Sequence, residues 1–126
     1  MGPTLNRRCL DSMILIDLLN GHREAVDAVE SSGDPVISIV TWIEVLAGVR
    51  NEDEERRARG LMAGMDVQPL SPEVAEMAIR YRKALRLKLP DAVILATARH
   101  LGCSLLTRNT QDFAGLGPDI TFPYTL

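Results

Sequence analysis

Apolar residues in this chain of 126 residues occur in two patterns, short continuous runs and longer stretches in which they recur with helical spacing. The short runs predict β-strands over residues 8–10, 36–38, 67–70, 103–106 and 120–122. The longer stretches predict helices over residues 11–20, 23–31, 40–49, 52–65, 72–88 and 91–101. Strands that alternate with helices indicate an α/β fold, with a central, largely parallel β-sheet flanked by helices.

Length and composition are those of a single globular domain, which we expect to span residues 1–126. No apolar run approaches the ~20 residues needed to cross a bilayer, so no membrane association is expected. The basic first residues are followed by Asp11 and Asp17 rather than by a long apolar stretch, which argues against a secretory signal. A cytoplasmic protein is therefore expected. Cys9 and Cys103 lie in short apolar runs and predict core residues.

The net charge of −3 lacks the positive excess typical of a simple nucleic-acid-binding protein. A cation bound to the protein would supply the positive charge that nucleic-acid binding requires. The 14 basic residues are nearly all arginine, whose planar guanidinium suits phosphate and carboxylate recognition.

Ligands of a parallel sheet bind beyond the carboxyl ends of its strands, and acidic residues lie there in this chain. Asp11 directly follows the first predicted strand, although on its own it is better explained as a helix N-cap. Glu44 is the only charge on a helix that is apolar on nearly every side, and it shares one narrow stripe with Thr41 and Gly48. Either this stripe faces solvent, or the buried carboxylate of Glu44 needs a partner or a cation.

Two further segments add oxygen ligands at the same edge of the predicted sheet. Asp91 begins another nearly all-apolar helix, where an acidic residue also interacts favourably with the helix dipole. Asn109 and Asp112 follow the strand over residues 103–106, in a segment that is otherwise typical of a turn. Each signal alone is weak, and together they predict a group of carboxylate and amide oxygens.

Clustered carboxylates repel one another, and their pKa values rise unless a positive charge is present. A hard divalent cation relieves this repulsion, and Mg²⁺ or Mn²⁺ favours carboxylate and water ligands. Such an ion also promotes hydrolysis of phosphodiesters. The pattern therefore favours a metal-dependent enzyme that acts on a nucleic acid.

Four segments in this order resemble the motifs of PIN domains: residues 10–17, 38–48, 89–98 and 105–113. The compact length and these segments are most similar to VapC-type toxins of toxin–antitoxin pairs. This resemblance implies a PIN-like domain that acts as an endoribonuclease with Mg²⁺ or Mn²⁺, forms a homodimer and is neutralised by a small antitoxin.

The resemblance also implies roles for individual residues. Catalytic roles fall to Asp11, Glu44, Asp91 and Asp112, and metal ligation to Asp11, Glu44, Asp91 and Asn109. Ser12 and Thr107 are supporting polar groups, and Arg7, Arg8 and Arg108 are candidate contacts to RNA. Asn109 stands where many relatives carry a fourth aspartate, and Asp112 lies three residues further on. Met13 stands where the family often has a small polar residue.

Two alternatives within the same fold remain at this point, a non-catalytic PIN-like module that binds RNA or protein and a PIN nuclease of RNA processing. Other aspartate-based folds fit poorly. A phosphotransfer receiver needs a lysine after a late strand, whereas Lys83 and Lys88 lie in or at the end of a predicted helix. A dehalogenase-type phosphatase needs an aspartate two residues after Asp11, where this chain has Met13.

Overall fold

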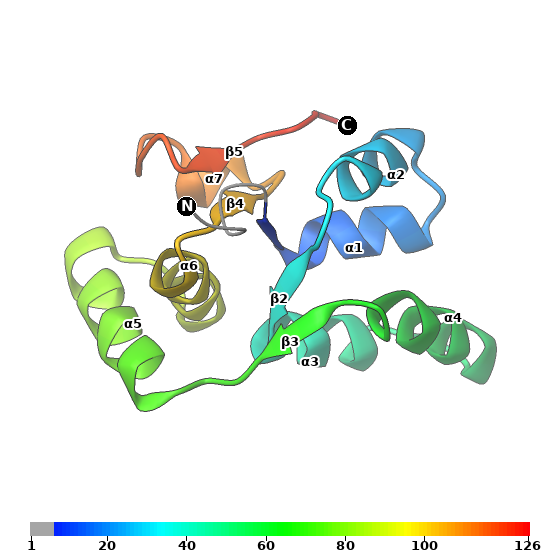
Figure 1. The fold of residues 1–126 in the computed structure, drawn as a ribbon, viewed down its shortest axis with the longest axis horizontal. Coiled ribbons are helices and arrows are strands. Elements are labelled where there is room, and N and C mark those ends of the chain that lie inside the picture. Colours follow the sequence, from blue (N-terminus) through cyan, green and yellow to red (C-terminus); the bar gives the residue numbers. More distant parts are fainter. Residues whose placement is uncertain (1–6) are drawn as a thin grey trace.

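The computed structural model describes residues 7–126, and its five strands form one sheet in which every neighbouring pair is parallel (Figure 1). The strands are β1 (Arg8–Leu10), β2 (Val36–Ser38), β3 (Asp66–Gln68), β4 (Ser104–Leu106) and β5 (Ile120–Thr121). Their order across the sheet is β3-β2-β1-β4-β5. The predicted α/β fold with a parallel sheet is thus confirmed.

Helices connect the strands and cover both faces of the sheet. They are α1 (Ser12–Leu19), α2 (Arg23–Glu30), α3 (Ile39–Ala47), α4 (Glu52–Met62), α5 (Pro72–Leu85), α6 (Leu89–Leu101) and α7 (Thr110–Phe113). In Figure 1, α5 and α6 lie together on one side, and α1, α3 and α4 lie on the other. None of the helices in residues 7–126 is long and apolar enough to span a membrane.

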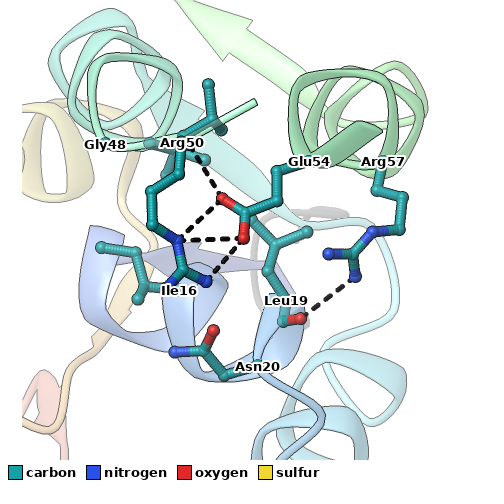
Figure 2. A pocket seen from close by; sticks show the side chains of 9 residues that line it. Ile16, Leu19, Asn20, Gly48, Arg50, Glu54 and Arg57 are labelled. Atoms are coloured by element: carbon teal, nitrogen blue, oxygen red, sulfur yellow. Dashed lines mark hydrogen bonds and ion pairs between the residues drawn. The ribbon is translucent and has the colours of Figure 1, made fainter. Parts of the chain in front are cut away.

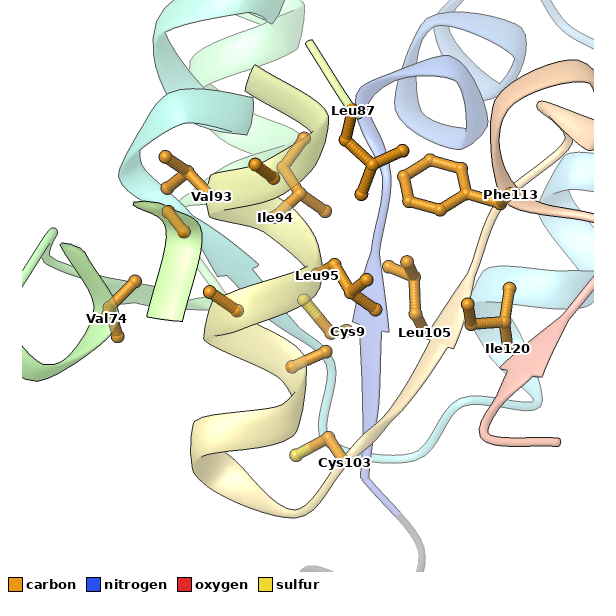
Figure 3. Close-up of a cluster of buried hydrophobic side chains, with 14 of the residues drawn as sticks. Cys9, Val74, Leu87, Val93, Ile94, Leu95, Cys103, Leu105, Phe113 and Ile120 are labelled. Carbon is orange, nitrogen blue, oxygen red and sulfur yellow. The ribbon is translucent and has the colours of Figure 1, made fainter. Parts of the chain in front are cut away.

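The core consists of two clusters, one on each face of the sheet, because successive side chains of a strand point to opposite faces. Cys9 and Leu105 contribute to the cluster beneath α5 and α6, which also contains Phe113 (Figure 3). Leu10 and Leu106 contribute to the second cluster, beneath α3 and α4. Burial on both faces explains why these strands are apolar at almost every position.

The predicted elements agree with the structure except at their ends. The helix expected over residues 72–88 ends at Leu85, because Arg86 has a left-handed backbone with φ 58°. The next helix therefore begins at Leu89 rather than at Asp91. β3 covers Asp66–Gln68 rather than residues 67–70. The turn expected after β4 contains a short helix, α7.

The sheet order determines where a ligand site can form. From β1 the chain proceeds outward through β2 to β3, and then returns to the other side of β1 as β4. Helices on either side of such a reversal diverge, so the crevice beyond the carboxyl ends of β1 and β4 is the expected site. Asp11 and Thr107 directly follow these two strands.

Candidate functional site

Asp11 is the buried centre of the candidate site, with only 2% of its surface exposed. It is the N-cap of α1, and its Oδ1 accepts a hydrogen bond of 2.8 Å from the backbone N–H of Ser12. The Thr107 hydroxyl donates to Asp11 Oδ2 at 2.7 Å. Burial raises the pKa of Asp11 above its usual value, although both hydrogen bonds counteract this and the charge of Glu44 adds to it. Each carboxylate oxygen is thus fixed from the protein side, without a cation.

Glu44 and Asp91 approach this carboxylate from two helices. Glu44 is half-buried on α3, one turn after Thr41, whose hydroxyl is completely buried. Asp91 is half-buried in the first turn of α6. Burial, the charge of Asp11, and the nearby Asp112 and Glu44 together raise the pKa of Asp91 to about 7. Such mutual effects require that the carboxylates lie near one another.

The segment after β4 presents Asp112 to this group. Asn109 caps α7, because its Oδ1 accepts a hydrogen bond from the Asp112 backbone N–H at 3.1 Å. The Nδ2 group of Asn109 donates to Asp112 Oδ2 at 2.9 Å. Its backbone N–H in turn donates to the Thr107 hydroxyl at 3.0 Å. Asn109 therefore links the Thr107–Asp11 contact to Asp112, and its own amide oxygen is already occupied.

The donor set matches a hard divalent cation in its chemistry. Four carboxylates supply oxygen only, and burial together with neighbouring negative charge raises the pKa values of Asp11 and Asp91. Thr41 Oγ1 on the helix of Glu44 is the one buried side-chain polar atom in the described part of the chain that has no hydrogen-bond partner. Within residues 7–126, no three acidic, histidine or cysteine side chains converge closely enough to hold an ion as they stand.

The three arginines expected to contact RNA lie elsewhere or are engaged. Arg7 precedes β1 and therefore lies at the edge opposite Asp11, where it forms an ion pair with Asp66 at 2.7 Å. Arg8 is half-buried in the first position of the same strand. Arg108 lies beside the site, but its guanidinium binds Asp17 through contacts of 2.6 and 3.0 Å.

The network around Asp17 was not predicted from the sequence. Asp17 is 3% exposed and accepts hydrogen bonds from Arg108 and from the Tyr124 hydroxyl, the latter at 2.7 Å. Burial alone would raise the pKa of Asp17, but these donors outweigh it and lower the pKa below its usual value. The partners lie more than 90 residues away in the sequence, so no local spacing could indicate them.

A groove of about 200 Å³ opens between α1, α3 and α4, separate from the carboxylates (Figure 2). Its walls are apolar at Ile16, Leu19, Val45 and Val49. Its rim carries Arg50, which holds Glu54 through an ion pair of 2.6 Å. Ile16 is 40% exposed and lies beside the other apolar side chains of the groove, which makes this groove a candidate docking surface.

Comparison with known proteins gives one family. The model of the PIN domain matches residues 8–117 of the chain. No curated protein matches it significantly. A solved toxin–antitoxin complex from Klebsiella pneumoniae contains a chain with 41% identity, a match that covers 94% of this chain and 99% of that chain with a TM-score of 0.89.

Two more distant structures show likeness of fold alone. FitAcB from Neisseria gonorrhoeae is 20% identical, with 94% of this chain and 99% of that chain covered and a TM-score of 0.77. VapBC2 from Rickettsia felis, solved with a DNA fragment from their promoter, is 16% identical, with coverages of 90% and 94% and a TM-score of 0.75.

Proposed function

This chain belongs to the PIN domain family, and from that premise we propose that it is a metal-dependent endoribonuclease and the toxin of a toxin–antitoxin pair. The observation that carries the proposal is the group of carboxylates at the reversal point of the sheet. Burial and the negative charges of neighbouring carboxylates raise the pKa values of Asp11 and Asp91. A module that only binds would gain nothing from such repulsion, which favours a catalytic role.

We assign Mg²⁺ or Mn²⁺ to this site, held by Asp11, Glu44 and Asp91, with Asp112 or Asn109 completing it. Such an ion polarises the scissile phosphate and lowers the pKa of the attacking water. The chain's own part is positioning. Thr107 and Ser12 hold the two oxygens of Asp11, so this carboxylate does not need to reorient when substrate enters. Asp91, with a pKa of about 7 in the free protein, would hold the ion as a carboxylate, because a positive charge beside it would lower that pKa.

RNA cleavage with and without Mg²⁺ tests this function, comparing wild type with Asp91→Asn. We expect cleavage by wild type only with the ion, and products with 5′-phosphate and 3′-hydroxyl ends, because water is the nucleophile. A matched control is Asp27→Asn, which removes an exposed aspartate whose ion pair with Arg23 spans 3.5 Å. Activity in excess EDTA, or products ending in 2′,3′-cyclic phosphate, would contradict the mechanism.

The position after β4 decides how many ions the site holds. We propose that one ion binds firmly and a second weakly, with Asp112 more important than Asn109 for the second. The engagement of both polar groups of the Asn109 side chain with Asp112 supports this assignment. Titration of Mn²⁺ during cleavage should show that Asn109→Asp lowers the concentration required and that Asp112→Asn raises it. Unchanged metal dependence and rate in Asp112→Asn would remove Asp112 from the site.

We propose a small antitoxin protein as the partner, bound in the groove between α1, α3 and α4. The apolar walls of this groove and its depth suit an amphipathic segment. A basic side chain of the antitoxin near Glu44 or Asp11 would pair with the acidic site and block it. Ile16→Glu should abolish co-purification with a co-expressed cognate antitoxin, whereas Ile79→Glu on α5 should not. Binding of the antitoxin that leaves the acidic site open would contradict the inhibitory mechanism.

We also propose a homodimer. Ile43 on α3, Leu70 before α5 and Leu89 at the start of α6 expose 48–58% of their surface. Exposed large apolar residues of this kind are typical of interfaces. Light scattering should give twice the monomer mass for wild type and the monomer mass for Ile43→Asp. A monomeric wild-type protein at micromolar concentration would contradict this assembly.

A further inference from the structure

The basic residues that form no ion pair within residues 7–126 are concentrated in one segment of the chain. Half of the 14 basic residues form ion pairs with acidic residues. Five of the remaining seven lie within nine residues, at Arg80, Arg82, Lys83, Arg86 and Lys88. No acidic residue occurs between residues 77 and 90, so this cationic segment carries five charges without compensation in a protein of net charge −3.

The packing of α5 turns these side chains outward. Val74 and Ala78 are buried against α6, and Tyr81 and Leu85 are partly buried along the same face. All five basic residues of the cationic segment are exposed. None of the five forms an ion pair within residues 7–126, which leaves them available to an external anion.

The cationic segment leads directly into the acidic site. Arg86 ends α5 in a left-handed conformation and turns the chain towards α6. Lys88 is the N-cap residue of α6, three residues before Asp91. The positive charge of Lys88 also acts on Asp112, whose pKa it helps to lower after the larger effect of Asn109. A chain of phosphates that crosses the carboxylates would thus meet the cationic segment next.

We infer that the cationic segment binds the phosphates of the RNA substrate and guides the strand into the carboxylate site. This inference rests on the proposed ribonuclease function. A protein of net charge −3 with an acidic site repels a polyanion except where positive charge is concentrated, and the cationic segment is such a place. An acidic protein partner fits less well, because Lys88 at the end of the segment acts on Asp112 in the proposed site and the apolar groove lies between other helices.

The test is RNA binding in the full chain carrying Asp91→Asn, so that the probe survives in the presence of Mg²⁺. Fluorescence anisotropy measures the Kd of a labelled 12-nucleotide single-stranded RNA across a range of salt concentrations. The first variant combines Arg80→Gln, Arg82→Gln and Lys83→Gln, and the second combines Arg86→Gln and Lys88→Gln. A matched control combines Arg23→Gln, Arg56→Gln and Arg59→Gln, which removes three exposed charges from α2 and α4.

We expect the first variant to raise the Kd at least tenfold and to reduce the slope of log Kd against log salt by about 2, since each lost phosphate contact on a single strand contributes about 0.7. The second variant should act in the same direction, and the control should leave the slope unchanged. Equal losses in the control and the first variant would overturn the inference, because net charge alone would then explain binding. Unchanged binding in both variants would also overturn it.

Two further measurements, a competition experiment and a cleavage assay, distinguish an RNA surface from a site for acidic protein and from failure of the proposed ribonuclease function. Poly-L-glutamate of matched charge should displace the RNA poorly, and displacement equal to that by unlabelled RNA would identify a site for acidic protein instead. Cleavage by the chain without Asp91→Asn is measured in parallel. Loss of binding in the first variant without any cleavage by wild type would reject the ribonuclease and retain the RNA surface. Normal cleavage with unchanged binding in both variants would reject the surface and retain the ribonuclease.

Discussion

Two buried aspartates at opposite ends of α1 have opposite electrostatic surroundings. Asp11 and Asp17 are 2% and 3% exposed. Asp17 accepts hydrogen bonds from the guanidinium of Arg108 and the hydroxyl of Tyr124, and its pKa lies below the usual value. Asp11 receives only a backbone N–H and a hydroxyl, has Glu44 nearby, and its pKa lies above the usual value.

The difference shows which carboxylates complete the fold and which form a site. A buried charge is tolerated when the protein supplies its partner, and at Asp17 it does so. At Asp11 and Asp91 the chain supplies further negative charge, which adds to the effect of burial and raises both pKa values. This arrangement destabilises the free protein and is explained if a cation from solution completes it. Such an excess of unpaired charge at one point is typical of functional sites.

The largest effect that separates the two aspartates is on cleavage. Asp11→Asn removes one negative charge from the proposed metal site and should lower the cleavage rate at saturating Mn²⁺ by at least about a hundredfold. Asp17→Asn leaves the metal ligands in place and should retain most of the rate at a temperature where the variant is folded. Rates measured for both variants on one RNA would contradict the distinction if the two losses were equal.

The second effect is on stability, where we expect Asp17 rather than Asp11 to have the larger effect. Asp17→Ala leaves Arg108 and Tyr124 without their acceptor, and we expect a loss of about 2 kcal/mol, reduced from the value for fully buried pairs because Arg108 is partly exposed. Thermal unfolding should show a fall in Tm of about 8 °C. As a control, Asp27→Ala removes only an exposed ion pair and should change Tm by less than about 2 °C.

The third effect is a pH dependence in the free protein. Asp91 has a folded-state pKa of about 7, above the value of about 3.9 in an unfolded chain. The folded state therefore retains this proton while the unfolded state has lost it, and stability falls as pH rises from about 4 to 7. In EDTA at pH 8, Asp91→Asn should raise Tm by about 4 °C, a value discounted for partial exposure. At pH 5 the variant and wild type should differ little.

Added Mn²⁺ should reverse this third effect. The ion stabilises the ionised carboxylates, so the Tm of wild type at pH 8 should rise with Mn²⁺ concentration and that of Asp91→Asn should not. Equal shifts in the two proteins would place the ion elsewhere.

The smallest effect concerns the second donor to Asp17. Tyr124→Phe removes one hydrogen bond and leaves the Arg108 ion pair intact, so we expect a loss of about 0.5 kcal/mol and a fall in Tm of about 2 °C. A double-mutant cycle with Asp17→Ala should show that the two losses are not additive, since they share one contact. Additive losses would show that Tyr124 acts through packing of the C-terminal segment instead.

The sequence was informative wherever a signal is local. The strand and helix order, the cap at Asp11, and the position of acidic residues after strands follow from neighbouring residues. These signals were enough to predict the fold, and they placed Asp11 and Thr107 at adjacent strand ends. The exact end of α5 could not be predicted, because a left-handed arginine at position 86 has no sequence signature.

What the sequence could not provide was the pairing of charges between distant segments. Nothing in the sequence distinguishes Arg7 and Arg108 from the other arginines. In the folded chain they form ion pairs with Asp66 and Asp17. Only after these pairs are removed does the cationic segment over residues 80–88 stand out. Likewise, the engagement of Asn109 with Asp112 depends on the turn into α7.

The most direct test of the account is the binding of Mn²⁺ to Asp11→Asn and Asp17→Asn, followed by the electron paramagnetic resonance signal of free Mn²⁺ at pH 8. Both variants lose one negative charge from a buried aspartate of the same helix, so net charge and position are matched. We predict that Asp17→Asn retains one tight Mn²⁺ site with nearly the affinity of wild type. Asp11→Asn should weaken Mn²⁺ binding at this site by at least about tenfold. Equal affinity in the two variants would contradict the claim that the carboxylates beyond β1 and β4 hold the ion.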